Sequence, residues 1–576
     1  MISRKAAQFN LLLMRTREQR INSQSTHRPA RSIATILGIL SICQFAQAQG
    51  PQGGNTHPLD LNQTVRRVLE RNEAMQMRML DVEISARVLK AEKGIFEPSV
   101  VASFDHLDSK KESTIQEQRS LLTSEFNQRN NIYDGGLEFL VPTGGRLKFG
   151  TSLRDLRNNL QSSITTSSNR LRHEYETFAG VSLTQPLLKN FGPNASTARI
   201  RLAALASDIA FQEYRRQQML TVARTESAYW DLHLTQEQEQ LSIESISLAG
   251  TILTNNRNRA AVGRMADLEV IQAQAGLSLR QARLSDARLK RLLASSQLTI
   301  LFAEPGILTN VIVMATDLPA VRTEPLTYFD SFEQAFLLNP DYLSRKKAIQ
   351  QENIKLAYAK NQRLPQLDLK ASYGLNGLGL TPGDSYGDID SQDRPAWSVG
   401  LEMRIPVTGG VKERNELAAA KLARQKALLG LKEVETQIGN ALQVGIQKVQ
   451  SAMANVTNYQ SVVDFHAQLL KSQMERLDVG RIDSRTVLET EEKLFEARIA
   501  VADSMVQYRK ALLELELSTG ATLQVRNLDL TMLELKGRTE SWAANLNWPA
   551  SSLEHYAREA GRGDFQGDLR ASEIIT

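Results

Sequence analysis

The sequence predicts a mixed α/β membrane protein in which long coiled-coil helices wall a tube and a few β segments contribute to a barrel shared between chains. Three observations support this fold class. No proline occurs between Pro193 and Pro305 or between Pro406 and Pro549, where proline would break a helix. A series of anchor residues occurs twice in the same order, and segments with alternating apolar residues lie within each copy.

Residues 1–48 predict a secretory signal peptide. A basic region up to Arg31 precedes the apolar run from Ile33 to Ile42 and the small-x-small sequence Ala46-Gln47-Ala48. Cleavage there removes six net positive charges from the +5 of the whole chain. The exported chain is therefore nearly neutral, and its basic pI is no sign of a nucleic-acid partner. The length of the basic region also allows Met14 as the start.

Cys43 is the only cysteine of the chain and lies inside the leader. Leu40-Ser41-Ile42-Cys43 is a weak lipoprotein-like signal, so lipidation stays open beside cleavage after Ala48. Cleavage leaves no thiol for a disulfide or a metal. After the leader there is no apolar run of about 18 residues, so no membrane-spanning helix is expected. Such a chain is soluble in the periplasm, secreted, or inserted as a β-barrel.

The proline-free windows are rich in Ala, Leu, Gln, Glu and Arg and predict long helices. In the second window, heptad-like spacing relates Leu488, Phe495, Ile499, Ala502, Val506, Leu513 and Leu517. At 1.5 Å per residue, a helix over 411–479 spans roughly 100 Å, and the pieces 484–517 and 328–363 span roughly 50 Å each. The first half of the chain shows the same relation, because a helix over 195–262 is about as long as the pieces 264–303 and 59–94 placed end to end. Long helices beside stacked short ones predict a tube.

The same tripeptide interrupts each window once, as Val262-Gly263-Arg264 and Val479-Gly480-Arg481. Glycine adopts left-handed backbone angles at little cost, so these sites suit helix ends and chain reversals.

Further paired anchors indicate a duplication. Asn72 and Pro98 are separated by 26 residues, as are Asn339 and Pro365. Each asparagine suits the start of a helix, and each proline the end of one before a strand. In addition, Val181-x-Leu183 precedes Gly192 at the spacing by which Val399-x-Leu401 precedes Gly410. The predicted organisation is a linker at 49–58, repeat one at 59–304 with β segments in 98–186, a linker at 305–324, repeat two at 325–520 with β segments in 366–406, and a C-terminal extension at 521–576.

The β segments alternate as an outer-membrane strand does, although a soluble sandwich alternates equally well. Four strands cannot close a barrel within one chain, so a membrane barrel needs several chains. Trp397 near a strand start fits an interfacial aromatic girdle. The first repeat adds a hairpin at 135–155, and whether it joins the barrel stays open. The polar stretches 105–131 and 156–173 are expected to be external loops.

These anchors resemble the TolC-type outer-membrane efflux protein family, also called outer membrane factors, over residues 59 to about 520. The resemblance implies a homotrimer whose subunits each give four strands to a 12-stranded transmembrane β-barrel, continuous with a periplasmic α-barrel of coiled-coil helices. It implies an outer-membrane channel that a periplasmic adaptor (membrane fusion protein) links to an inner-membrane transporter of the RND, ABC or MFS type. It implies no catalytic residue and no cofactor.

The resemblance also places the Val-Gly turns at the periplasmic mouth, as helical tips that contact the adaptor: Val262, Gly263, Arg264, Val479, Gly480 and Arg481. The family narrows this mouth with acidic residues just after the turns, which makes Glu269 and Glu489 candidate gate residues, with Asp267 and Asp483 nearby. Thr486, at the position equivalent to Glu269, departs from the acidic pattern. Arg481 and Arg485 are candidate partners that hold a closed state. Solvated helix faces are the alternative interpretation, favoured for Asp267 and Asp483.

Two other classes of protein are alternatives. An enzyme is disfavoured because the seven histidines are scattered and no metal, phosphate-loop or nucleophile motif occurs. A structural or adhesive coiled-coil protein of the envelope would share the leader and heptads but has no need of duplicated strand pairs. Within the channel interpretation, the transported substrate, drug, metal ion or protein, stays open.

Overall fold

The structure is a computed structural model that describes residues 56–121, 124–159, 173–302, 312–317, 319, 327–407 and 409–544. The predicted signal peptide, with Met14 and Cys43, lies outside these residues, as does the end of the C-terminal extension. The described residues belong to one compact unit. Among their helices, none combines the length and the apolar character that crossing a membrane requires.

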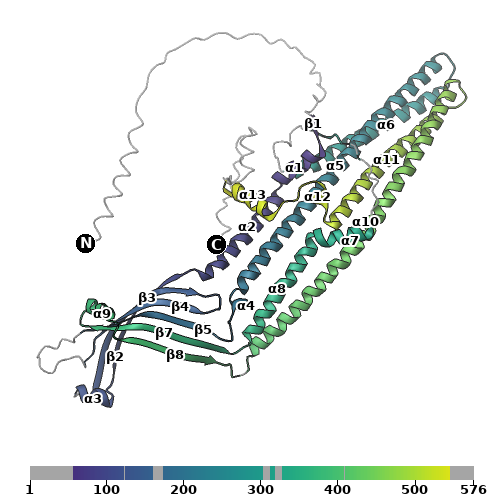
Figure 1. Cartoon of the computed structure of the whole chain (residues 1–576). Helices are drawn as coiled ribbons and strands as arrows, with labels where there is room; N and C mark the ends of the chain where they lie inside the picture. The colour runs from purple at the N-terminus through teal and green to yellow at the C-terminus, as the bar shows by residue number, and fades with distance from the viewer. Residues whose placement is uncertain are drawn as a thin grey trace, which may run out of the picture. The chain divides into compact units, whose positions relative to one another are not determined.

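Two pairs of long antiparallel helices dominate the unit (Figure 1). In the first half α5 (Ala198–Ala261) packs on α6 (Asp267–Leu301), and in the second half α10 (Val411–Asp478) packs on α11 (Ser484–Thr519). These helices begin and end close to the predicted bounds, because the Val-Gly turns and the prolines that limit them are readable in the sequence.

A pair of shorter helices joined at an asparagine precedes the strands of each half. The pairs are α1 (Leu61–Arg71) with α2 (Glu73–Lys93), and α7 (Tyr328–Leu338) with α8 (Pro340–Gln362). The Asn72 side chain accepts hydrogen bonds from two backbone N–H groups at the start of α2, at 3.1 and 3.3 Å. Asn339 does the same for α8, at 2.9 and 3.2 Å. Both asparagines are N-caps, as the sequence predicts.

The strands form one antiparallel sheet of six, in the order β2-β3-β4-β5-β7-β8. Their bounds are β2 Ser99–Glu112, β3 Glu125–Leu140, β4 Arg146–Leu156, β5 Glu174–Pro186, β7 Gln366–Gly379 and β8 Pro395–Arg404. The predicted extra hairpin is β3–β4. It joins the sheet between β2 and β5, so one copy contains six adjacent strands where the resemblance implies four.

The expectation of an external loop over 105–131 is wrong. Most of this stretch continues the β2–β3 ladder, which pairs residue by residue up to Glu112 and Glu125, and the short helix α3 (Ile115–Leu121) follows β2. The prediction failed because this part of the ladder is polar on both faces and shows no apolar alternation. Most of the second predicted loop, 156–173, lies outside the described residues.

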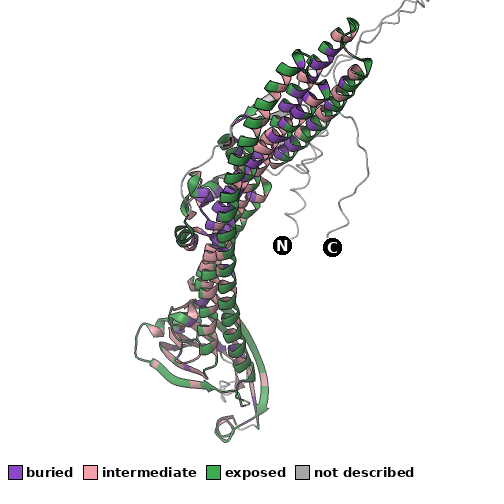
Figure 2. Cartoon of the chain, turned by 90° about the vertical axis from the view of Figure 1, so that its right-hand side faces the viewer, coloured by how far each residue is buried: buried purple, intermediate pink, exposed green. Residues whose placement is uncertain are grey.

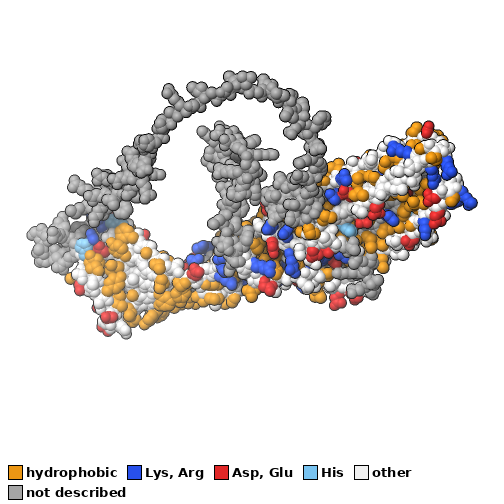
Figure 3. Space-filling model, turned by 90° about the horizontal axis from the view of Figure 1, so that it is seen from above, with side chains coloured by type: hydrophobic (Ala, Val, Ile, Leu, Met, Phe, Trp, Pro, Cys, Tyr) orange, Lys and Arg blue, Asp and Glu red, His pale blue; other side chains and the backbone are white. Residues whose placement is uncertain are grey.

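The two faces of the sheet differ in character. On one face apolar side chains follow each strand, and many are exposed, including Tyr373 at 61% and Trp397 at 73%. Figure 3 shows hydrophobic side chains gathered over the strands, while charged side chains are spread over the helices. The other face carries ion pairs between neighbouring strands, such as Arg154–Glu176 at 3.3 Å and Lys148–Asp134.

Small elements connect these parts: β1 (Thr56–Leu59), η1 (Gly94–Phe96), α4 (Pro193–Ser196), β6 (Ile312–Ala315), α9 (Pro382–Ile389), α12 (Thr522–Val525) and α13 (Met532–Ala544). β1 and β6 pair in parallel, within segments that the sequence analysis takes as linkers. Four-residue strands are too short to show a period. Tyr229 of α5 fixes this pair, because its buried hydroxyl donates to the carbonyl of Leu59 at 2.9 Å and accepts from the N–H groups of Thr316 and Asp317.

The core lies along the helices, and Figure 2 shows buried residues following the surfaces where they meet. One cluster unites both halves of the chain: Val68, Tyr229, Leu298 and Phe302 of the first half pack with Val506 of the second. Residues 521–544 of the predicted extension also contribute, through the buried Leu523 and Leu535.

Candidate functional site

The two Val-Gly turns end α5 and α10 with the same geometry. Gly263 has φ +69° and Gly480 has φ +72°. The N–H of Arg264 reaches back to the carbonyl of Arg259 at 2.8 Å, and the N–H of Arg481 reaches that of Arg476 at 2.9 Å. This is the Schellman arrangement, in which a left-handed residue satisfies the last carbonyls of a helix. A Cβ at either glycine would meet open space, so the backbone angle is what requires glycine.

The tips of the two helix pairs are bound to each other. Near the turns, the Asn256 amide of α5 donates to the hydroxyl of Ser484 at the start of α11, over 3.0 Å. Arg259 donates to the carbonyl of Leu477 at 2.9 Å and to that of Asp478 at 3.3 Å. An apolar cluster supports these bonds: Ala249, Ile252, Leu477, Val487 and Leu488. The two turns therefore lie side by side at one end of the helices.

The structure assigns a structural role to one predicted gate residue. Asp483 is the N-cap of α11, and its carboxylate accepts from the backbone N–H of Thr486 at 3.1 Å and from the Thr486 hydroxyl. The hydroxyl bond holds the pKa of Asp483 below its ordinary value. The threonine that departs from the family's acidic pattern is thus the residue that secures this cap.

The other candidates lie at the surface of the tips. Glu489 pairs with Arg485 at 2.7 Å, and this exposed pair raises the pKa of Arg485. Because the two residues belong to one helix, their ion pair does not tie one helix to another. Glu269 is partly exposed, and within the described part of the chain its carboxylate forms no ion pair. Asp267, in the first turn of α6, and Arg481 are exposed.

A buried ion pair between α6 and α11 is not among the residues predicted from the sequence. Arg280 and Glu491, whose side chains are 4% and 7% exposed, form it behind the tips. The guanidinium also donates to the carbonyl of Leu488 at 3.1 Å and to the hydroxyl of Ser245 at 3.0 Å. A sequence signal exists, since the buried positions of α6 at heptad spacing are Ala273, Arg280, Ala287 and Ala294. An arginine in an alanine seam indicates a buried partner.

Apolar side chains are exposed around the turns. Val262 is 69% exposed, Leu268 63%, Ile271 64% and Val479 68%. Such a cluster at the end of a helix pair is typical of a protein contact surface.

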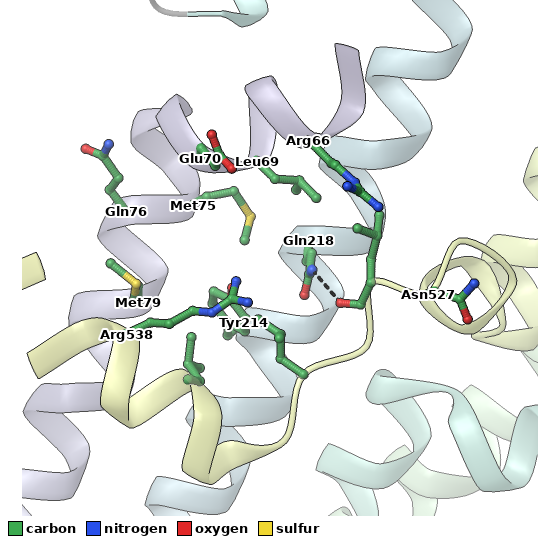
Figure 4. Close-up of a pocket in the computed structure, with 13 residues that line it drawn as sticks. Arg66, Leu69, Glu70, Met75, Gln76, Met79, Tyr214, Gln218, Asn527 and Arg538 are labelled. Carbon is green, nitrogen blue, oxygen red and sulfur yellow. Dashed lines mark hydrogen bonds between the residues drawn. The ribbon is translucent and has the colours of Figure 1, made fainter. Parts of the chain in front are cut away.

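A separate pocket of about 480 Å³ lies where the C-terminal segment crosses the short helices (Figure 4). Met75 and Met79 line it, Arg66 and Arg538 reach into it from opposite sides, and the Gln218 amide donates to the carbonyl of Leu528 at 3.1 Å. Over the described ranges, no three His, Cys, Asp or Glu side chains come together as a metal site. The helical tips are therefore the candidate site.

Comparisons with known proteins agree with this architecture. The Campylobacter jejuni CmeC outer membrane channel shares 15% identity and a TM-score of 0.52, over 82% of this chain and 90% of that one. The Vibrio cholerae outer membrane protein VceC shares 15% identity and a TM-score of 0.53, over 80% of this chain and 96% of that one. The open state of the Neisseria gonorrhoeae MtrE outer membrane channel shares 16% identity and a TM-score of 0.51, over 82% of this chain and 91% of that one. No curated protein matches by sequence.

The family described as outer membrane efflux protein matches residues 152–303 and 332–521, more than half of the chain. The first matched segment begins inside β4, so β2 and β3 precede it. The chain belongs to the outer membrane efflux protein family, and it is a bacterial outer-membrane efflux channel with a periplasmic helical domain.

Proposed function

We propose that three copies of this chain form the exit duct of a tripartite efflux or type I secretion system. A periplasmic adaptor binds the helical tips, and an inner-membrane transporter of the RND, ABC or MFS type drives the substrate through the passive duct. The observation that carries the proposal is a sheet that is apolar on one face and polar on the other, joined directly to two long helix pairs. The sheet suits a wall between lipid and water, and the helices extend the duct into the periplasm.

A bilayer experiment tests the duct. The purified protein should run as a heat-modifiable trimer and should form open channels in planar lipid bilayers. A monomeric protein without conductance would refute the proposal.

The exposed apolar residues at the turns support adaptor binding. Replacing Val262 and Val479 by Ser should weaken binding of the adaptor by at least tenfold, because each residue exposes a large apolar surface at the tip. Leu533→Ser is a matched control, since Leu533 is 81% exposed on α13, away from the turns. Trimer yield and conductance should not change in either variant. Equal weakening by the control would contradict the placement of the adaptor.

The carboxylates after the turns support a cation-attracting gate. Threefold symmetry would repeat Glu269 and Glu489 into rings, and acidic rings attract cations and disfavour anions. Glu269→Gln with Glu489→Gln should therefore abolish block by multivalent cations and lower cation selectivity. Glu496→Gln is the control, because Glu496 lies seven residues further along the same exposed helix face. Unchanged block and selectivity in the double variant would refute the gate.

A further inference from the structure

We infer that each copy supplies all six strands to the shared wall, so that three copies close an eighteen-stranded pore in which β8 of one copy pairs with β2 of the next. The inference rests on the trimeric channel proposed above. It concerns how the copies meet and how wide the exit is.

The hairpin β3–β4 shares the two-faced pattern of the other strands, row by row. The register aligns one apolar row across the whole sheet: Val100, Leu137, Phe149, Val181, Tyr373 and Trp397. The row beside it points to the opposite face and is polar: Ser99, Glu138, Lys148, Ser182, Ser372 and Ser398. A hairpin that only capped the barrel would have no reason to keep its apolar residues in line with those of the wall. This agreement favours contact of all six strands with lipid on one side and water on the other.

Charged side chains support the same orientation. Asp134 of β3 pairs with Lys148 of β4, and Arg154 of β4 pairs with Glu176 of β5 at 3.3 Å. All four lie on the polar face. A Lys or Arg facing lipid at the middle of a membrane costs about 2–4 kcal/mol, and an acid somewhat less, so these strands are placed well only if their polar face lines the lumen.

A row of glycines bends the hairpin together with the wall. Gly136, Gly150, Gly180 and Gly374 are aligned on the polar face, next to each other on four successive strands. A Cβ at Gly136 would lie 2.5 Å from a backbone oxygen of β4, and one at Gly180 would lie 2.4 Å from a backbone oxygen of β7. Glycine at aligned positions lets a sheet curve tightly, as a barrel wall must. Two of the four glycines belong to β3 and β4, so the hairpin follows the same curve.

The two edges of the sheet suit each other. β2 offers 14 residues and β8 offers 10, and neither edge has a further strand within the described residues. β2 begins, and β8 ends, at the helical end of the sheet, so the two edges run in opposite directions. Pairing β8 with the β2 of a second copy therefore continues the antiparallel order, and three copies of six strands close with an even total. The occupant of each edge is another copy of this chain.

Strand number sets the pore width. With strands about 4.8 Å apart and tilted by about 40°, twelve strands close a ring of backbone about 24 Å in diameter, and eighteen strands close one about 36 Å in diameter. The open area is more than doubled, because diameter grows nearly in proportion to strand number. The outer exit of this duct would therefore admit bulkier substrates, folded segments included, than a twelve-stranded exit admits.

Disulfide cross-linking tests the edges in the full chain. In a Cys43→Ser background the introduced cysteines are the only ones. Ser398→Cys on β8 is combined in turn with Ser99→Cys, Val101→Cys and Ser103→Cys on β2, since closure of a barrel staggers the register. At least one pair should give covalent dimers and trimers under oxidation. The control is Ser99→Cys with Ser182→Cys on β5. These positions lie three strand spacings, about 14 Å, apart in the six-stranded wall, and would be adjacent if the hairpin lay outside it.

Deletion of residues 113–173 provides a second measurement. It joins the far end of β2 to the start of β5, keeps the antiparallel order and leaves four strands per copy. Because the gate proposed at the tips limits conductance, the measurement is entry of neutral polymers from the β-sheet side, and the deleted channel should already exclude smaller polymers than the full one. The inference is overturned if the Ser99–Ser182 pair cross-links within one chain, or if the deleted channel admits polymers of the same size as the full one from the β-sheet side. If the deletion does not assemble, cross-linking alone decides. Failure of the proposed function differs from these outcomes, because the full chain would then show neither conductance nor cross-links between copies.

Discussion

Removing the Arg280 side chain should loosen the attachment of α6 to α11. In Arg280→Ala the Glu491 carboxylate, only 7% exposed, loses its ionic partner, and the carbonyl of Leu488 and the hydroxyl of Ser245 lose a donor. A buried charge left without a partner costs about 3–5 kcal/mol. The pair Arg485–Glu489 is the control, since its side chains are 68% and 58% exposed. A pair so exposed contributes little to stability, because both charges stay solvated and their attraction is screened by salt.

Hydrogen exchange measures this difference locally, without requiring the trimer to unfold in two states. Because 1.4 kcal/mol corresponds to a factor of ten, amides of α6 and α11 around the pair should exchange roughly two to nearly four orders of magnitude faster in Arg280→Ala. Arg485→Ala should change exchange by about fivefold or less. The double variant Arg280→Met with Glu491→Met should recover most of the protection, because it leaves no charge buried. Equal exchange in Arg280→Ala and Arg485→Ala would refute the reasoning.

Three further predictions concern single residues. Gly520→Ala should destabilise the helical domain by more than Gly480→Ala in chemical unfolding. Both glycines have positive φ, a conformation that costs alanine about 1–2 kcal/mol. A Cβ at Gly520 would in addition lie 2.6 Å from the backbone of Asn339. Asp483→Ala should lower stability at neutral pH, and its difference from wild type should vanish in unfolding curves as the pH falls below the ordinary value of 3.8, because a carboxylate with a lowered pKa stabilises only while ionised. Tyr229→Phe should cost about 1–3 kcal/mol and speed hydrogen exchange in β6, since backbone groups lose their buried partner.

Each of these has a clear contrary result. Equal losses in the two glycine variants would show that the backbone near Gly520 moves aside. A pH-independent difference for Asp483→Ala would mean that the carboxylate charge does not stabilise the cap. Unchanged exchange in β6 would show that Tyr229 does not hold the strand pair.

Helices and their ends could be predicted because their signals are local. Asn72 and Asn339 cap their helices by bonds within three residues along the chain, and the Val-Gly turns need only a glycine with positive φ. The duplicated spacing also predicts the order of the helices and strands, because it depends on positions in the sequence and not on contacts.

The candidate site was predicted less completely, because its bonds join distant parts of the chain. Arg280 and Glu491 are 211 residues apart, and only the alanine seam around Arg280 hints at their pairing. Asp483 is exposed, in line with the solvated interpretation, and is also a helix cap, a role that an acid followed three residues later by a hydroxyl could suggest. The polar part of β2 and β3 could not be predicted as strand, because its sequence shows no apolar alternation.

The interlocking of the two halves has a consequence for how the chain reaches its folded state. Arg526 pairs with Glu226 and Lys510 pairs with Asp231, so α5 lacks these two ionic partners until the C-terminal part of the chain arrives. Such long separations slow folding and leave apolar surface uncovered for longer. A first half that emerges ahead of the second therefore keeps part of α5 uncovered, and a chain that stalls before residue 510 offers proteases and chaperones this incomplete surface. The arrangement makes completeness of the chain a condition for assembly.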